Sequence, residues 1–111
     1  METTYTLLGV NGTKCVATLD LPKEPGYDVL AKIIRPLIGR GRDFERVNVL
    51  HEGKYTDMFV DDSGLLDHLP INVAATAIYR NNVLTHEKGA IADDLPAIHG
   101  NAILFSRKVW Y

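Results

Sequence analysis

The sequence predicts an α+β fold, with a four- to five-stranded antiparallel or mixed sheet, one principal helix and one short helix. Two β-rich runs meet at Asn11-Gly12, apolar residues recur with helical spacing over residues 29–38, and alternating apolar and polar residues follow from residue 46. A chain of 111 residues with 46% hydrophobic residues can bury one core and is too short for two. We therefore expect one domain over residues 1–111.

Residues 4–19 are predicted to form a β-hairpin, because the pair Asn11-Gly12 readily adopts the positive φ angles of a tight turn. A connecting loop is expected over residues 20–26, which contain two prolines and a glycine. A helix then follows, since the residues on one of its faces are apolar: Val29, Leu30, Ile33, Ile34, Leu37 and Ile38. Pro36 requires this helix either to end near Arg35 or to continue with a kink to Gly39.

A second hairpin is predicted from residue 46, with a turn at residues 52–54. In its second strand Met58 and Val60 share one face, while Asp57 and Asp61 share the other, which we expect to be an outward polar face. A turn at residues 62–64 leads to a short helix over 73–80 capped by Asn72. Residues 81–100 are predicted to be an irregular excursion, and residues 102–110 a closing strand.

The composition argues against several classes of protein. Twelve Lys and Arg residues stand against fourteen Asp and Glu residues, a net charge of −2, so nucleic acid is an unlikely partner. Cys15 is the single cysteine and forms no internal disulfide, which fits a reducing compartment. The first residues lack a basic region followed by an apolar stretch, and no apolar run is long enough to cross a bilayer. We expect a cytoplasmic protein without a membrane partner.

The segment 38–47, IGRGRDFERV, raises the question of an anion site. Arg40, Arg42 and Arg46 could pair with phosphate oxygens, but no phosphate-binding glycine motif is present. Asp43 and Glu45 lie close enough in the sequence to neutralise the arginines, and arginines near a helix C-terminus also complement its dipole. Of the two interpretations, anion binding and a structural turn, the second is favoured.

Neither a metal site nor a catalytic centre is indicated by the remaining reactive residues. His51, His68, His86 and His99 have no zinc-binding spacing, and Cys15 sits in an apolar strand, so no metal or cofactor is expected. An enzyme with His51 or His68 as a base beside an Asp is a minority hypothesis. The aromatic residues Trp110 and Tyr111 either form a partner surface or fold back on the core.

Residues 57–80, DMFVDDSGLLDHLPINVAATAIYR, followed by a Gly-containing strand, resemble the family known as domain of unknown function 3846. The resemblance covers about residues 28–106, and the positions that carry it are Leu30, Ile38, Gly39, Glu45, Val47, Met58, Val60, Gly64, Leu69, Pro70, Asn72, Ala75, Thr76, Ile98, Gly100, Asn101 and Ala102. The chain departs from the family in its longer 39–44 segment and its long 81–95 stretch. The resemblance implies a small protein of a phage, plasmid or bacterial host and carries over no catalytic residue.

These observations favour a non-enzymatic binding protein of a phage or other mobile element. We expect it to act stoichiometrically on a protein of the bacterial host, for example as a counter-defence protein, with contacts through the 39–46 loop, the 81–100 segment or the C-terminal aromatic residues. Two alternatives stay open. One is a protein that sequesters a small anionic, nucleotide-like ligand through Arg40, Arg42 and Arg46, and the other is a small hydrolase. Exposed edge strands would also allow a homodimer.

Overall fold

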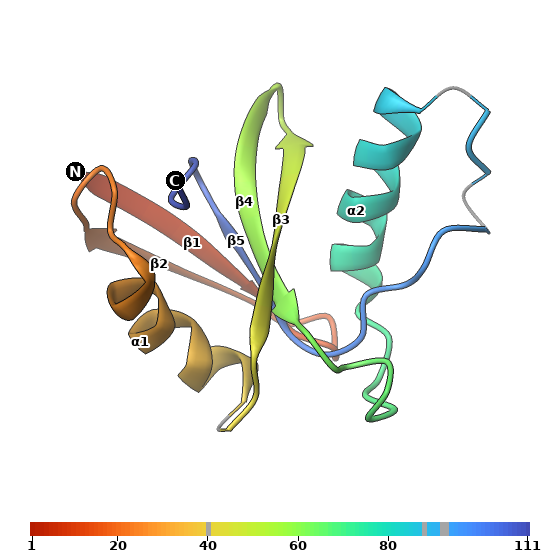
Figure 1. Cartoon of the computed structure of the whole chain (residues 1–111), viewed down its shortest axis with the longest axis horizontal. Helices are drawn as coiled ribbons and strands as arrows, with labels where there is room; N and C mark the ends of the chain where they lie inside the picture. The colour runs from red at the N-terminus through yellow and green to blue at the C-terminus, as the bar shows by residue number, and fades with distance from the viewer. Residues whose placement is uncertain (40, 88, 92–93) are drawn as a thin grey trace.

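The computed structural model of the chain has a five-stranded sheet and two helices, and it describes residues 1–39, 41–87, 89–91 and 94–111 (Figure 1). The elements in chain order are β1 (Glu2–Leu8), β2 (Lys14–Asp20), α1 (Tyr27–Ile38), β3 (Phe44–His51), β4 (Lys54–Asp61), α2 (Val73–His86) and β5 (Ala102–Phe105). The strand order is β2-β1-β5-β4-β3, and every neighbouring pair is antiparallel. The predicted α+β class and antiparallel sheet are confirmed.

The two helices lie on opposite faces of the sheet, α1 on the left and α2 on the right in Figure 1. Phe59 of β4 and Ile103 of β5 pack with Leu30 and Ile34 of α1. Their neighbours in the strands belong to a second core cluster, in which Ala75 of α2 packs. Successive side chains of a strand point to opposite faces of the sheet. Because a helix covers each face, the side chains on both faces of β4 and β5 are buried. This explains the uninterrupted burial of residues 56–61 in β4.

The expectation that Asp57 and Asp61 form an outward polar face is wrong. The alternation itself is as predicted, but Asp57 and Asp61 flank the core residue Phe59 on the face that α1 covers, and both are buried. An antiparallel sheet often leaves one face to water. Here a helix covers each face, so the buried aspartates of β4 form hydrogen bonds with other groups of the protein instead of with water.

The two hairpins have different turns. The tighter turn is the one between β3 and β4, at Glu52-Gly53, and not the one at Asn11-Gly12. The first loop spans Gly9–Thr13, closed by a 2.8 Å bond from Gly9 N to Thr13 O, and Gly12 alone has a positive φ, of 83°. The second loop contains two residues, Glu52 and Gly53, with φ angles of 51° and 82°. Positive φ at both central positions is the signature of the tight turn that matches strand twist.

Helix α1 passes through Pro36 and ends at Gly39, the second of the two predicted outcomes. Its last turn is closed by a 2.9 Å bond from Gly39 N to Arg35 O. Gly39 has φ 144°, in the region that favours glycine, so the helix stops where a residue without a Cβ allows the chain to leave.

Helix α2 is longer than expected and corrects the prediction for residues 81–100. It was expected to be short, but it runs for 14 residues to His86, so residues 81–86 are helical. Residues 88, 92 and 93 of the predicted excursion lie outside the described residues. Asn72 is its N-cap, as predicted, and its side chain accepts a bond from Ala75 N. None of the helices in the described residues is long and apolar enough to cross a membrane.

The closing strand is shorter than predicted, because β5 ends at Phe105 rather than near Trp110. The segment after it is held by side chains instead of a strand ladder. The guanidinium of Arg107 donates to the carbonyls of Pro22 and Lys23 and to the hydroxyl of Thr3, each at 2.9 Å. These bonds bring the segment after β5 against the connection between β2 and α1.

Candidate functional site

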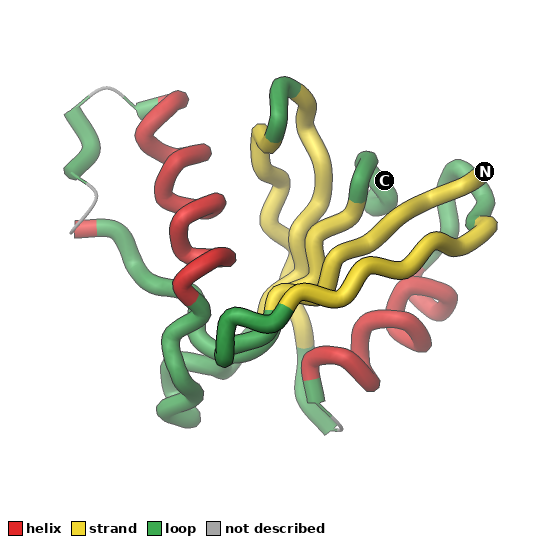
Figure 2. The backbone as a smooth tube through the Cα atoms, turned by 180° about the vertical axis from the view of Figure 1, so that it is seen from behind, coloured by secondary structure: helices red, strands yellow, loops and turns green. Residues whose placement is uncertain are grey.

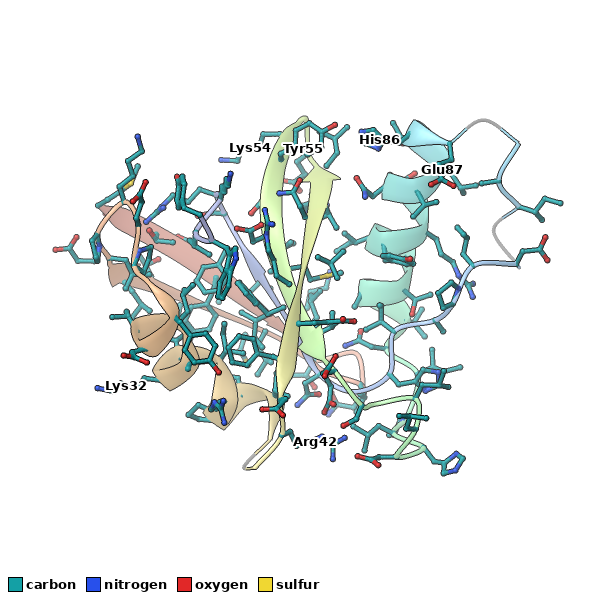
Figure 3. The ribbon with its side chains drawn as sticks, viewed as in Figure 1. Lys32, Arg42, Lys54, Tyr55, His86 and Glu87 are labelled. Carbon is teal, nitrogen blue, oxygen red and sulfur yellow. The ribbon has the colours of Figure 1, made fainter. Side chains whose placement is uncertain are left out.

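The described arginines of the 38–47 segment are bound to carboxylates of the chain itself. Arg42 donates through Nε to Asp61 and through Nη2 to Asp67 at 2.7 Å, and it lies near the bottom of the view in Figure 3, beside the loop that follows β4. Arg46 donates through Nε to Asp57 Oδ1 at 2.8 Å. These partners differ from the Asp43 and Glu45 suggested by the sequence. The hydrogen bond from Arg42 lowers the pKa of the Asp67 carboxyl.

Arg42 and Arg46 therefore bind different positions of β4, since Asp61 is its last residue and Asp57 lies in its middle. Arg40 lies outside the described residues. Binding of a small anion by Arg40, Arg42 and Arg46 stays a prediction. The bonds of Arg42 and Arg46 to buried aspartates give both a structural role as well.

The Asp57 carboxylate is the most heavily bonded polar group of the sheet. Besides Arg46 it accepts bonds from Asn48 at 3.2 Å and from the backbone amides of Val109 and Trp110 at 2.9 Å. Burial alone would raise the pKa of Asp57, but the bonds from Arg46, Trp110, Val109 and Asn48 outweigh it and hold the pKa below its usual value. The carboxylate thus stays ionised and anchors the segment after β5.

Trp110 and Tyr111, the predicted partner surface, have different surroundings. The Trp110 ring packs edge-on against Tyr27 and Phe59 and belongs to the core that α1 covers. Tyr111 is exposed, with the Lys108 ammonium 4.9 Å from its ring centre. Both rings line a cavity of about 340 Å³ next to the start of α1. A partner contact through these rings stays a prediction.

The segment Leu69-Pro70-Ile71-Asn72, which contributes to the family resemblance, has a structural role. Asn72 is fully buried, and its side-chain amide donates to Leu8 O at 2.8 Å and to Gly100 O at 2.9 Å while its oxygen caps α2. Its backbone N–H donates to Ile98 O at 2.8 Å. One side chain therefore joins β1, α2 and the segment before β5. Gly64 is required for the same packing, because a Cβ there would lie 2.2 Å from the carbonyl oxygen of His99.

The four histidines differ in their neighbours. His99 bonds Leu69 O through Nδ1, and His86 bonds Asn82 O and the hydroxyl of Tyr55, which faces it across the gap in Figure 3. His51 lies near Glu52, and His68 occupies a loop position with φ 56°. Across the described ranges, no three His, Cys, Asp or Glu side chains converge as metal ligands would.

An acidic cleft of about 210 Å³ lies between α2 and the open end of the β3–β4 hairpin, where β3 begins and β4 ends. Glu45, Asp62, Tyr79 and His99 contribute polar groups to it. Burial and, to a smaller extent, the charge of Asp62 raise the pKa of Glu45. Ala97 lines both this cleft and a second, apolar groove along α2.

A groove of about 290 Å³ runs along the outer side of α2. Its lining consists of Ile71, Val73, Thr76, Ala77, Arg80 and Ala97. Val73 is 76% exposed and Ile71 51% exposed, both large values for apolar side chains. Segment 95–98 forms the far wall and is held to α2 by two side chains: Arg80 donates to Leu95 O at 2.9 Å, and Ile98 N donates to Thr76 Oγ1 at 2.8 Å.

One side of α2 carries the exposed residues Val73, Ala77 and Leu84 and the half-buried Arg80, and these four residues are here called the α2 stripe. Their spacing of four, three and four residues places them on one side of a helix. The buried residue Ala75 lies on the opposite side, against the sheet, while the buried Thr76 lies beside the stripe and faces segment 95–98. A helix with apolar residues on two sides has little amphipathic character, which explains why the sequence pattern around residues 73–80 could not be assigned firmly.

The α2 stripe escaped the sequence-based prediction because residues 81–86 were expected to be irregular. That boundary separated Leu84 from the other members of the stripe. The signal is nevertheless present in the sequence, since Val73, Ala77, Arg80 and Leu84 follow a heptad-like spacing. No family model, curated protein or solved structure matches this chain, so the site rests on the geometry described above.

Proposed function

We propose that this chain is a non-enzymatic binding protein that engages a partner protein through the α2 stripe and the groove beside it. The observation that carries the proposal is the second apolar side of α2, which faces away from the sheet and which the described residues leave exposed. A helix in a three-layer fold needs one apolar side to pack on its sheet. A second such side has no role in folding and is typical of a docking surface.

The partner element that fits this surface is an amphipathic helix. Residues spaced by four, three and four positions match the ridges that two helices interleave when they pack. The small side chains of Ala77 and Ala97 let another helix approach closely, and Val73 and Ile71 provide its apolar contacts. Segment 95–98 limits the groove on one side and so fixes the position of the incoming helix.

We expect this helix to carry a carboxylate opposite Arg80. The Nε of Arg80 is buried without a hydrogen-bond partner, the one such side-chain atom found in the described part of the chain. Because this Nε is closed off from solvent, an incoming carboxylate would pair with the rest of the guanidinium, which lines the groove and carries the same positive charge. The partner would thus present an apolar ridge with one Asp or Glu. The resemblance to a family of mobile-element proteins makes a bacterial host protein the proposed source of this helix.

Site-specific photo-crosslinking in bacterial cells tests the proposal. A photo-crosslinking residue is introduced at position Ala77 in the groove and, as a matched control, at position Lys32, which points away from α1 into solvent (Figure 3). We expect one discrete crosslinked partner from position 77 and none from position 32. Equal crosslinking at both positions, or none at position 77, would overturn the proposal.

Two further variants define the chemistry of the contact. Val73→Asp places a charge on the α2 stripe, and an acidic residue in the first turn of a helix is compatible with folding. It should abolish the crosslink from position 77. Arg80→Gln should weaken the affinity of the purified partner by about tenfold, the loss expected for one charge-assisted bond. Unchanged affinity in both variants would mean that the partner binds elsewhere.

A further inference from the structure

The two edges of the sheet are protected very differently. The outer strand β3 is covered by α2: Leu50 N donates to Asn82 Oδ1 at 2.8 Å, and Asn82 Nδ2 lies 3.5 Å from Asn48 O. Asn82 thus occupies backbone groups that an added strand would need. The exposed charged residues Glu45 and Arg46 also disfavour the pairing of this edge with a strand of another molecule.

The opposite edge, β2, has none of these protections. Its seven residues pair with β1 in one continuous register from Asp20 to Lys14, so no bulge interrupts it, and it contains no proline. Its central residues 15–19, Cys-Val-Ala-Thr-Leu, carry no charge, and Val16 is 67% exposed. For residues 15–19, the described part of the chain provides no backbone hydrogen bond beyond those to β1. Figure 2 shows β2 as the outermost strand of the sheet.

We propose that β2 pairs with β2 of a second copy of this chain, antiparallel and about a two-fold axis at Ala17. The sheets of both copies would then join into one continuous sheet. Proteins protect long, regular, uncharged edge strands unless another strand pairs with them. The contrast between β2 and the covered β3 edge is therefore the first argument for this interface.

The charges at the ends of β2 select a second copy as the partner and fix the register. With Ala17 opposite Ala17, Lys14 lies opposite Asp20 of the second copy, and the two-fold axis repeats this pair at the other end. Lys14 and Asp20 are both exposed. The amino group of Met1 contacts Asp20 Oδ1, which leaves Oδ2 for the lysine. A shift of two residues in either direction would break both charge pairs, and opposite charges across strands are stabilising.

The uncharged pairs also match in this register. Val16 faces Thr18 of the second copy, two β-branched residues that suit a pleated surface, and Cys15 faces Leu19. This contact lies at the far edge of the sheet from the α2 stripe, so the dimer and the proposed partner helix do not compete for the same surface. Failure of one proposal therefore leaves the other testable.

Disulfide trapping tests the register directly. Ala17→Cys in a Cys15→Ser background places the two new thiols opposite each other, with Cα atoms about 4.5–5.5 Å apart, a separation that a disulfide spans. We expect mild oxidation to give a covalent dimer. The unmodified protein is the matched control, because in this register its two Cys15 residues are offset by four positions, about 13 Å, and cannot bridge. A trapped dimer that forms equally fast through Cys15 would overturn the register.

A charge-reversal cycle tests the interface without a disulfide. Lys14→Asp and Asp20→Lys each create like-charged pairs and should weaken the dimer, measured by analytical ultracentrifugation, by about tenfold. The double variant restores opposite charges and should recover the dimer. Both side chains are exposed, so the variants should fold as the unmodified chain does. A protein that is monomeric at all concentrations, or single variants that dimerise unchanged, would overturn the proposal.

Discussion

The Asp57 carboxylate accepts a hydrogen bond from the backbone amide of Trp110 at 2.9 Å, so a residue of the inner strand β4 fixes the segment that follows β5. The same oxygen accepts Val109 N at 2.9 Å, while the other oxygen binds Arg46. Val109 and Trp110 in turn cover the core beneath α1. A buried charge is thus compensated by a cation on one side and two amides on the other.

Asp57→Asn should destabilise the protein by about 1.5–3 kcal/mol, the range for hydrogen bonds to a charged group. The amide side chain has the same shape, but it loses the attraction to Arg46 and turns one acceptor into a donor opposite a backbone N–H. Urea denaturation gives the free energy of unfolding, and the emission of Trp110, the single tryptophan, reports release of the segment. Asp43→Asn, an exposed carboxylate 3.6 Å from Arg35, is the matched control and should have almost no effect.

The contribution of Asp57 should disappear in acid. Its pKa is lowered in the folded protein, so the stabilisation is fully present above the unfolded pKa of about 3.9 and is lost as pH falls through the lower folded value. The difference in unfolding free energy between the wild type and Asp57→Asn should therefore be constant near neutral pH and shrink below about pH 4. A difference that grows in acid would contradict the assignment of Asp57 as an ionised anchor.

The alternation in β4 could be predicted from the sequence, but the burial of its polar face could not. Period-two patterning separates Asp57 from Met58 whichever way the strand faces. Whether the polar face meets water depends on a second covering layer, and the partners Arg46 and Trp110 are 11 and 53 residues away from Asp57. The arginines of the 38–47 segment were hard to interpret for the same reason, since Asp61 and Asp67 reach Arg42 only in the folded chain.

Asn72→Ala should cost about 2–4 kcal/mol, because it removes the cap of α2 and the amide that donates to the carbonyls of Leu8 and Gly100. Asn72→Asp separates these two effects. It keeps an oxygen for the Ala75 amide but places a carboxylate against two carbonyl oxygens. If the cap dominated, Asn72→Asp would be nearly as stable as wild type in thermal denaturation, whereas we expect a loss close to that of Asn72→Ala.

The cap at Asn72 was predictable, while the length of α2 was not. A local side-chain bond to Ala75 depends on neighbouring residues, so the sequence indicates it. Residues 81–86 contain two asparagines and a threonine, which are weak helix formers. The helix continues there because Asn82 bonds the β3 edge and His86 bonds Tyr55, contacts that form through tertiary structure.

Glu45→Gln should stabilise the protein slightly at neutral pH, by at most about 0.5 kcal/mol. Its pKa is raised by burial and by Asp62, so ionisation of Glu45 opposes folding above its usual pKa of about 4.3. The gain should therefore vanish below that pH. In an Asp62→Asn background the gain should also shrink, since one cause of the raised pKa is removed. Differential scanning calorimetry at neutral and acidic pH measures both effects.

Gly64→Ala should destabilise the protein by about 1–3 kcal/mol through steric conflict, the range for overpacking. The added Cβ would lie 2.2 Å from His99 O, and the segment before β5 would have to move away from the loop after β4. That movement would disturb the bond between Asn72 N and Ile98 O and so loosen the start of α2, which amide hydrogen exchange of Ala75 and Thr76 detects. Gly12→Ala is the control, because Gly12 has a positive φ of 83° but open space around it. It should lower stability through backbone strain alone and leave exchange in α2 unchanged.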